Sequence, residues 1–483
     1  MSSKFVTQEK IDGRVDSFLI QEGIQYKVFK EKPNKLTFNR LDVAFKLLYL
    51  KLRERNIRLA EEIYYSHIRA FSLGEYKERG CDTKNSKLDF IDTFNKIIDS
   101  IELSGFDSEN SIIPISSHDQ SIINGSHRYS VTFNNHLLTT FVELDIKPSL
   151  YDYKFFKERG VEESILEMAV TEFIERSDDC YIAILWPTAK PNSKVDEILG
   201  KLLYKKKISL SQQGAHNLLS IVYKGEPWLG EEKDNYPGII GKQQHCFSGK
   251  EEIVLYAFQA DDLSSVLRKK EEIRQLYGIG KHAIHITDNN LESIEVAQAL
   301  LNENSIFFIN NSNPNKYYDH NKYIFDTVLD GNKKLDQVIE GGSILSLFGL
   351  RLGRDIDVLA LGEECSKCDG IDIHNDLVKY HQMPIEDLVY DSRNYFYFNG
   401  VKFISIDRLK KFKINRNEAK DNADVSLIDS ILENGYKSKL KKIKSEMFFL
   451  KARCKRSCKL ILKDILVKLG VFDFVINAKR NLF

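Results

Sequence analysis

Residues 339–361 read IEGGSILSLFGLRLGRDIDVLAL, and this stretch decides how the C-terminal half of the chain is interpreted. Eleven residues separate Ser343 from the triplet Asp355-Ile-Asp357, which an apolar run follows. Successive side chains of a strand point to opposite faces, so Asp355 and Asp357 are expected to share one face. Two carboxylates on one face predict a site for Mg²⁺, which prefers oxygen ligands and usually also holds substrate phosphates. The alternative is an exposed Asp pair on an edge strand.

The same spacing resembles the signature of the polymerase-β-like nucleotidyltransferase superfamily. A second block, FISIDRLKKFKINRNEAKDNADVSLI at 403–428, is similar to the helical segment that follows the sheet in small members of that superfamily. The resemblance implies a nucleoside triphosphate and Mg²⁺ or Mn²⁺ as cofactors, with Gly342 and Ser343 approaching the triphosphate. It also implies a third carboxylate on a later strand, for which Asp387 and Asp391 are the candidates.

Three cations of the second block are expected to lie on one helix face. Lys413, Arg416 and Lys420 follow one another at three- and four-residue spacing. This face either meets a nucleotide or pairs with Asp421 and Asp424.

The middle of the chain carries a histidine in a strand-like setting. The segment GKHAIHITDNNLESIEVAQALL at 280–301 places His285 on a predicted strand, with Arg274 shortly upstream. An imidazole can accept a phosphoryl group when one nitrogen is oriented and the other is free. A partly buried strand histidine without such a role is the alternative.

This segment looks like the active-site region of nucleoside diphosphate kinases, and YIAILWPTAKPNSKVDEILGKLL at 181–203 is similar to their first strand and helix. The resemblance implies a ferredoxin-like α/β domain, a phosphohistidine role for His285 and phosphate binding by Arg274. Two positions depart from the family: Trp186 stands where its lysine is usual, and Ile286 where glycine follows its histidine.

A third motif, Gly125-Ser126-His127-Arg128, lies in SIINGSHRYSVTFNNHLLTTFVEL at 121–144. The sequence pattern from residue 112 onward predicts a strand, a turn, a helix and a second strand. The N–H groups and dipole of a helix N-terminus favour an anion, and a guanidinium grips phosphate with two hydrogen bonds. A capped surface helix with a solvated arginine is the alternative.

The context of this motif resembles the core of the ParB/sulfiredoxin superfamily, whose members bind nucleotide phosphates at a comparable turn. The resemblance implies that Gly125, Ser126, His127 and Arg128 bind nucleotide phosphates. Asn124 stands where the superfamily usually has aspartate.

The remaining periodicity completes a multidomain α+β prediction. Apolar residues at helical spacing predict one or two helices over 40–75, a helix over 89–104 that ends at Gly105, and a linker-like helical stretch over 151–177. The Asn/Pro-rich segment 310–321 predicts a loop and a boundary. The predicted divisions are a helical segment with a ParB/sulfiredoxin-like α/β domain (1–150), a ferredoxin-like α/β domain (178–312), a nucleotidyltransferase-like mixed-sheet domain (322–432) and a basic amphipathic helical tail (433–483).

Composition excludes several classes of protein. The 483 residues include 70 Lys or Arg and 70 Asp or Glu, and no apolar run is long enough for a membrane-spanning helix. The first residues have no apolar signal core, which favours the cytoplasm. Seven cysteines do not predict a disulfide framework. The single pair Cys365 and Cys368 is too little for a zinc site.

Although the net charge of the chain is zero, its C-terminal segment is basic. Between 437 and 483 there are fourteen Lys or Arg against three acidic residues, interspersed with apolar residues at roughly helical spacing. A basic amphipathic helix can lie on an anionic membrane surface. An RNA contact and packing on the protein itself are the alternatives. The ending KLILKDILVKLGVFDFVINAKRNLF resembles the tails of bacterial glycosyltransferases and of capsule or lipopolysaccharide enzymes.

Together these features predict a cytoplasmic transferase, peripheral at the inner face of the membrane. Its expected activity is kinase or nucleotidyltransferase chemistry on a small phosphorylated or sugar-linked substrate, in capsule or lipopolysaccharide biosynthesis and beside other polysaccharide enzymes. One alternative acts on nucleic acid, as a ParB-like nuclease or a tRNA nucleotidyltransferase. Another is a catalytically inactive scaffold.

Overall fold

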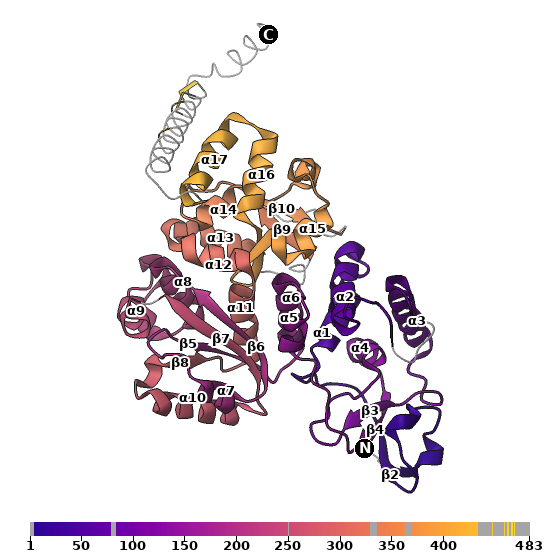
Figure 1. Ribbon diagram of the computed structural model, residues 1–483. Coiled ribbons are helices and arrows are strands. Elements are labelled where there is room, and N and C mark those ends of the chain that lie inside the picture. The colour runs from indigo at the N-terminus through magenta and orange to yellow at the C-terminus, as the bar shows by residue number, and fades with distance from the viewer. Residues whose placement is uncertain are drawn as a thin grey trace, which may run out of the picture. The chain divides into compact units, whose positions relative to one another are not determined.

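The chain is a multidomain α+β protein, seen in a computed structural model (Figure 1). The structure describes residues 4–78, 84–249, 251–328, 336–362 and 370–432, with a few single positions between 447 and 468. One compact unit joins Met1–Asn375 to Met383–Ser405, and the other joins Asp376–Gln382 to the segment from Ile406 onward. These limits differ from the four predicted divisions, which stay a prediction.

The N-terminal part of the first unit contains a four-stranded sheet in the order β1-β2-β4-β3. Strands β3 and β4 are parallel and the other neighbours are antiparallel. The predicted order of strand, turn, helix and strand is confirmed by β3, α4 and β4. The bounds are β1 Lys4–Thr7, β2 Gln25–Glu31, α1 Asp42–Leu52, α2 Ile57–Phe71, α3 Lys87–Ser104, β3 Ile113–Ser116, α4 Ser126–Asn134 and β4 Thr139–Leu144.

Helix α3 illustrates how local sequence sets these elements. The Ser86 side chain accepts a hydrogen bond from the Asp89 N–H and so caps the first turn, and Gly105 ends the helix with φ 77°. Phe90, Phe94, Ile98 and Ile101 recur every three or four positions and are buried. The helix predicted over 89–104 is therefore confirmed.

The middle of the first unit contains an antiparallel sheet in the order β6-β7-β5-β8. Every residue of the central strand β5 is buried. Helices α7 and α10 cover one face, where their apolar side chains join those of β5 and β7 in one core. The bounds are α5 Tyr153–Glu158, α6 Glu163–Glu175, β5 Cys180–Leu185, α7 Ser193–Leu199, β6 Leu202–Ser209, α8 Gln212–Val222, α9 Ile239–Phe247, β7 Glu252–Gln259, α10 Leu263–Tyr277, β8 Ile284–Ile286 and α11 Asn290–Leu300.

A mixed five-stranded sheet in the order β11-β10-β9-β13-β12 completes the first unit. Pairs β10/β11 and β9/β13 are parallel and the other neighbours are antiparallel. Phe308 of α12 stacks on Phe396 at 4.5 Å between ring centroids, which fixes that helix on the sheet. The bounds are α12 Glu303–Asn311, α13 Tyr318–Val328, β9 Gln337–Glu340, α14 Gly342–Leu347, β10 Ile356–Ala360, β11 Ile371–Ile373, α15 Ile385–Tyr390, β12 Tyr395–Phe398 and β13 Val401–Ile404.

The loop predicted over 310–321 is wrong for most of its length. Helix α12 continues to Asn311, a 3₁₀ turn spans Pro314–Tyr317, and α13 begins at Tyr318. Proline is tolerated at the start of a helical turn, where its missing N–H costs nothing. The buried Asn321 amide donates to the Pro314 carbonyl at 2.6 Å, so the Asn-rich composition serves a tight junction between helices.

In the second unit, α16 (Ile406–Arg416) packs on α17 (Ala419–Leu432). Lys413 is buried and lies 3.3 Å from Asp421 and 2.7 Å from Asp424, while Arg416 lies 2.7 Å from Asp421. Of the two alternatives for this basic face, pairing with the acidic residues of α17 is the one present. Two of the three cations thus hold the helix pair together.

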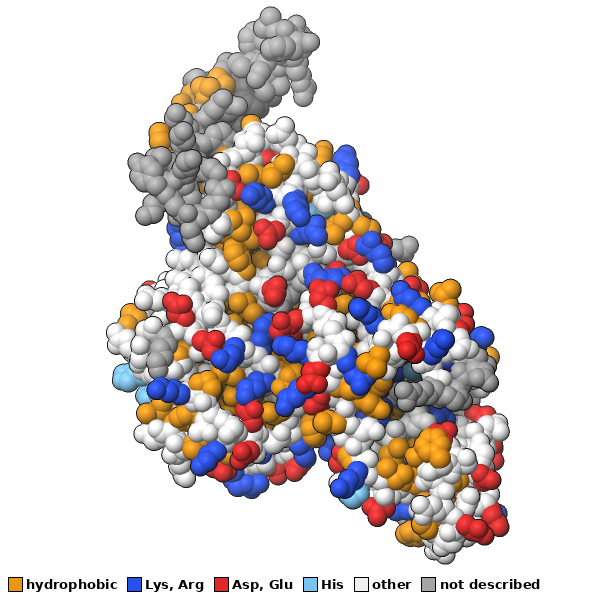
Figure 2. Space-filling view, viewed as in Figure 1, with side chains coloured by type: hydrophobic (Ala, Val, Ile, Leu, Met, Phe, Trp, Pro, Cys, Tyr) orange, Lys and Arg blue, Asp and Glu red, His pale blue; other side chains and the backbone are white. Residues whose placement is uncertain are grey.

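The surface mixes charges of both signs, as Figure 2 shows for one face. Among the residues that the structure describes, no helix is both long and apolar enough to cross a membrane. The pair Cys365 and Cys368 lies outside the described residues, as does the basic tail apart from single positions.

Candidate functional site

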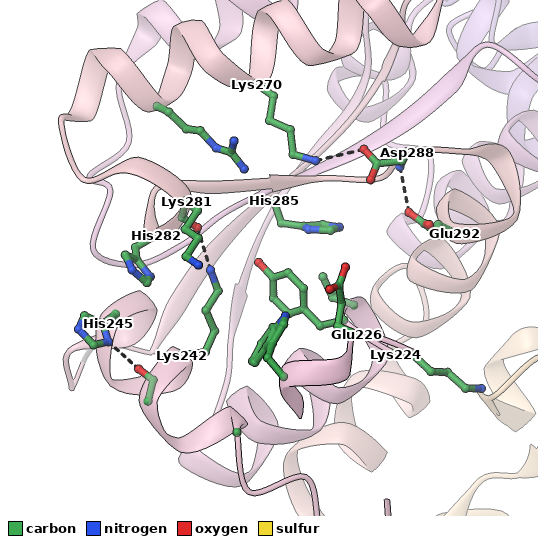
Figure 3. Close-up of a pocket in the computed structure, with 16 residues that line it drawn as sticks. Lys224, Glu226, Lys242, His245, Lys270, Lys281, His282, His285, Asp288 and Glu292 are labelled. Carbon is green, nitrogen blue, oxygen red and sulfur yellow. Dashed lines mark hydrogen bonds and ion pairs between the residues drawn. The ribbon is translucent and has the colours of Figure 1, made fainter. Parts of the chain in front are cut away.

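A pocket of about 600 Å³ opens beside β8, with walls from α8, α9 and α10 (Figure 3). Its lining is rich in titratable side chains and also contains two aromatic rings. The basic residues are Lys224, Lys242, Lys270, Arg274 and Lys281, the acidic residues Glu226, Asp288 and Glu292, the histidines His245, His282 and His285, and the aromatic residues Tyr223 and Trp228.

His285 lines the pocket from β8, where it lies opposite Ile184 of β5. Its ring packs edge-on against Tyr223 at 5.2 Å between centroids and is 8% exposed. None of the described residues hydrogen-bonds the ring. Burial, helped by Lys270, Lys242 and Arg274, lowers the pKa of His285 to about 3. The imidazole is therefore neutral at physiological pH, with an unshared electron pair for a ligand.

The cations around the histidine are held by different partners. Lys270 lies 3.1 Å from Asp288, and Lys242 lies over the Tyr223 ring at 5.1 Å. The buried Nε of Arg274 has no hydrogen-bond partner among the described residues. An unsatisfied buried guanidinium nitrogen costs free energy, which an anionic ligand would recover.

The structure brings the predicted pair His285 and Arg274 into one pocket. Sequence reasoning missed Lys242 of α9 and Tyr223, which directly follows α8; both are far from the histidine in sequence. The chain around each of them carries no motif, so no sequence signal pointed to them. Trp186, at the position of the expected lysine, is fully buried and packs against Phe247.

The predicted phosphate motif at the start of α4 is satisfied by protein groups. Gly125 caps the helix in a left-handed conformation with φ 81°. The His127 ring lies 2.9 Å from the Tyr64 hydroxyl, and burial holds the pKa of His127 well below its ordinary value. The guanidinium of Arg128 donates to Ser111 and lies directly over Gly125. The His127 ring and the Arg128 guanidinium, which were expected to meet phosphate, thus each have a protein partner.

Ser126 of the same motif makes its described hydrogen bond within the helix. The Ser126 carbonyl accepts a hydrogen bond from the Ser130 hydroxyl at 2.7 Å, inside the helix. Nothing in the described contacts of Ser126 sets it apart from an ordinary first-turn residue.

The motif of the mixed sheet forms a tight turn between β9 and β10. Ser343 donates from its hydroxyl to the Asp355 carbonyl at 3.1 Å, and Asp357 accepts a hydrogen bond from the Gly342 N–H. Asp355 directly precedes β10 and Asp357 lies within it. These residues are brought together as the sequence predicts, but they bind one another.

A histidine that sequence reasoning missed joins this turn. His374 Nε2 lies 3.3 Å from Asp357, and His374 Nδ1 lies 3.0 Å from the fully buried Glu340. Burial raises the pKa of Asp357 to about 6, with Glu340 and Asp355 adding to the rise and His374 opposing it. The His374 imidazole thus lies between the carboxylates of Asp357 and Glu340; the hydrogen bond to Glu340 and the charge of Asp357 raise the pKa of His374.

The candidates for a third carboxylate lie outside the sheet, so their expected place on a strand is wrong. Asp387 is on α15, where it accepts from Asn56 at 2.8 Å and pairs with Arg58. Asp391 caps the next turn and pairs with Arg393 at 2.9 Å. Arginine partners and capping explain both carboxylates without a metal.

Two acidic residues are register neighbours of Asp357 in the sheet: Glu340 on β9 and Asp372, its parallel neighbour on β11. Sequence reasoning also missed Asp372. Its apolar-acidic-apolar setting, Ile371-Asp372-Ile373, was the sequence signal that could have found it. Among the described residues no three His, Cys, Asp or Glu side chains are arranged to hold a metal ion. His374 contacts Asp357 at this place, and the Mg²⁺ site at Asp355 and Asp357 stays a prediction.

Comparisons with known proteins add no relative from which a function can be carried over. No family, no curated protein and no solved structure matches the chain. The function must therefore be inferred from the geometry of the described residues.

Proposed function

We propose that this protein is a phosphate-transfer enzyme in which His285 accepts a phosphoryl group from a nucleoside triphosphate. The observation that carries the proposal is the His285 ring: neutral, free of hydrogen bonds to the described residues, and surrounded by Lys242, Lys270 and Arg274. A neutral imidazole is a nucleophile, and nearby cations stabilise the charge of a transferring phosphoryl group.

The chemistry is an in-line displacement. The unshared electron pair of one imidazole nitrogen forms a bond to the terminal phosphorus, and the bond from that phosphorus to the bridging oxygen breaks. The electron pair of the broken bond leaves with the nucleoside diphosphate, and the other ring nitrogen keeps its proton. The phosphohistidine then passes the group to a small acceptor, which is the class of reaction predicted for the chain.

The topology around the pocket supports this proposal. The order β6-β7-β5-β8, with α7 after β5 and α10 after β7, is the order expected for a ferredoxin-like βαββαβ unit. Nucleoside diphosphate kinases share that unit, as the resemblance of 181–203 and 280–301 implies. The phosphate cradle we propose here consists of Arg274, Lys270 and Lys242.

Incubating the full chain with γ-³²P-labelled ATP or GTP and Mg²⁺ is expected to give an acid-labile, base-stable label. The variant His285→Asn should lose at least about 90% of it, because an amide cannot replace the nucleophile. His282→Asn, which alters another histidine of the same pocket, is the matched control and should keep most of the label. A label that survives His285→Asn would remove this histidine from the reaction.

A second candidate function, nucleotidyl transfer at the mixed sheet, is favoured by the register of Asp372 with Asp357 on neighbouring strands. The order of β9, the glycine turn, α14 and β10 also fits the superfamily that the motif resembles. Here the nucleoside triphosphate would arrive as its Mg²⁺ or Mn²⁺ complex, and we assign no step to a metal held by the protein.

Release of pyrophosphate from CTP or ATP with Mg²⁺ tests this second candidate. The double variant Asp355→Ala/Asp357→Ala is expected to lower the rate at least about 100-fold, because these carboxylates would hold the Mg²⁺ of the arriving nucleotide complex. The His285→Asn variant should leave it unchanged. Unaltered turnover in the double variant would exclude the mixed sheet from the chemistry.

The wider setting is proposed from the predicted features of the sequence. A phosphate-transfer site and a nucleotidyl-transfer site in one chain suit the synthesis of a nucleotide-activated, sugar-linked precursor for capsule or lipopolysaccharide. The basic end would hold the protein at an anionic membrane surface beside other polysaccharide enzymes. A steep salt dependence of RNA or DNA binding would instead favour the nucleic-acid alternative.

A further inference from the structure

One end of the pocket described above is lined by basic side chains. Lys242 of α9 donates from Nζ to the Lys281 carbonyl at 2.9 Å, and Lys281 lies in the 3₁₀ turn Gly280–His282 that precedes β8. The rings of His245 and His282 stack beside them, with 4.8 Å between their centroids. We call Lys242, Lys281, His245 and His282 the basic end of the pocket.

The basic end has no acidic partner. Figure 3 shows it on one side of His285, with Asp288 and Glu292 on the other. Asp288 lies 3.1 Å from Lys270, which gives that carboxylate a cation of its own. Among the residues that the structure describes, no carboxylate forms an ion pair with any of the four basic-end side chains. The charges of its two lysines are therefore not compensated by the protein.

Burial makes the missing counter-charge costly at Lys242. This residue is 9% exposed, and its contacts are the Lys281 carbonyl, the Tyr223 ring and the Cys246 thiol. Burial lowers the pKa of Lys242; Cys246 opposes this effect and Lys281 adds to it. A buried charge without an opposite charge costs free energy, and an anion bound beside it recovers that cost.

The basic end and the proposed nucleophile border the same aromatic ring. The centroid of the Tyr223 ring lies 5.2 Å from that of His285 and 5.1 Å from Lys242 Nζ. The pocket volume of about 600 Å³ is within the ~300–1,000 Å³ of sites that hold whole small-molecule ligands. A ligand with an anionic group at the basic end can therefore present another of its atoms to His285.

The cations of the pocket come from separate elements. Lys270 and Arg274 are on α10, whereas Lys281 is on the turn before β8, and Lys242 of α9 borders both groups. A histidine that receives a phosphoryl group and passes it on meets a donor and then an acceptor, and each must be held in position. The α10 cations serve the transferred group, which leaves the basic end for the acceptor.

We propose that Lys242 and Lys281 form an anion subsite for a phosphate monoester group of the acceptor, which is thus a phosphorylated small molecule. This inference rests on the proposed function, whose acceptor it names. A phosphate monoester carries a charge of about −1.5 to −2 at pH 7, which matches two lysines.

The transfer to such an acceptor balances without a further reactant. A hydroxyl oxygen of the acceptor forms a bond to the phosphorus on His285, and the bond from that phosphorus to the imidazole nitrogen breaks. The nitrogen recovers its electron pair, and the hydroxyl proton passes to water. The phosphate held by Lys242 and Lys281 takes no part in bond making and orients the hydroxyl.

Calorimetric titration of the full-length protein with glycerol 3-phosphate, and separately with glycerol, tests the subsite. Only glycerol 3-phosphate is expected to bind, because it alone carries the anion. The variant Lys281→Gln should weaken its binding at least about ten-fold, the scale of losing one hydrogen bond between charged groups. The Lys281 carbonyl remains in this variant, so Lys242 keeps its hydrogen bond.

Lys224→Gln is the matched control. Lys224 lines the same pocket, but its Nζ donates to Asn399 at 3.2 Å, and its loss should change the affinity by less than about two-fold. Equal weakening by both lysine variants, or equal binding of glycerol and glycerol 3-phosphate, would overturn the proposal. So would a loss in Arg274→Gln that Lys281→Gln does not share, since the phosphate would then lie among the α10 cations.

Titration with a non-hydrolysable ATP analogue and Mg²⁺ separates the acceptor from the donor. If Lys281→Gln weakened the analogue as strongly as glycerol 3-phosphate, Lys281 would serve the triphosphate and the proposal would be wrong. No phosphoryl group is transferred in any of these titrations. Their outcome is therefore independent of the labelling of His285, which tests the proposed function by itself.

Discussion

Replacing Gly341 with alanine is expected to lower the free energy of unfolding by about 3 kcal/mol and to displace Asp357. Gly341 has φ 74°, a conformation that costs an L-residue roughly 1–2 kcal/mol. A Cβ at this position would also overlap Oδ2 of Asp357 and contact its Cβ at 3.1 Å. The turn can therefore lie this close to the strand only because Gly341 has no side chain.

The neighbouring glycine is the matched control for this substitution. Gly342 has no positive φ, and a Cβ there would meet the end of the Arg351 side chain at 3.4 Å and the Gly353 Cα at 3.7 Å, both without overlap. Gly342→Ala should therefore change the free energy of unfolding by less than about 1 kcal/mol. Urea titrations followed by circular dichroism and by limited proteolysis give both values. Equal losses for the two variants would contradict the strained turn.

Local sequence patterns predicted the elements that depend on local physics. The run of 181–186 reads as a buried strand because its letters are uniformly apolar, and β5 is buried at every residue. The loop over 310–321 was wrong because the same Asn and Pro residues that end helices also begin them. Composition alone does not distinguish a loop from a close junction between two helices.

Local sequence patterns could not predict the order of the strands in the sheets. Strand β9 pairs with β10, which follows soon after it, but also with β13, more than sixty residues later. The pairing of β9 with β13 depends on how whole elements pack together and not on the residue types of either strand. The mixed character of the sheet was predicted only through the resemblance of 339–361.

The residues of the candidate sites also include some that local sequence revealed and some that it did not. His285 and Arg274 were found because they lie close together in the chain beside a recognisable strand. His374 was missed because its partner Glu340 lies 34 residues away. Burial is a property of the assembled unit, and it is burial that lowers the pKa of His285.

The variant Asp42→Asn is expected to lower the free energy of unfolding by about 3–5 kcal/mol, which is typical of leaving buried charges without their partner. Asp42 lies 2.8 Å from Arg40 and 3.1 Å from Lys46, and all three side chains are at most 4% exposed. Burial alone would raise the pKa of Asp42, but Arg40 and Lys46 together hold it well below its ordinary value. The amide removes the only carboxylate that these described contacts give the two cations.

The pH dependence of the loss follows from the sign of that shift. A carboxyl whose folded-state pKa is depressed stabilises the protein above its unfolded value of about 3.9, and the contribution disappears as the pH falls below it. The difference between the natural protein and Asp42→Asn should therefore be constant from pH 8 to 5 and shrink below about pH 4. Urea unfolding at each pH measures it.

A half-exposed ion pair in the same part of the chain is the control. Lys27 and Glu143 are 2.7 Å apart, with side chains 43% and 17% exposed, so Glu143→Gln should cost no more than about 1 kcal/mol. Both substitutions change a carboxylate to an amide of the same shape, but Asp42 pairs with two buried cations and Glu143 with one half-exposed lysine. If Asp42→Asn were as mild as Glu143→Gln, the cluster around Arg40 and Lys46 would have access to water, and its burial would not describe the protein in solution.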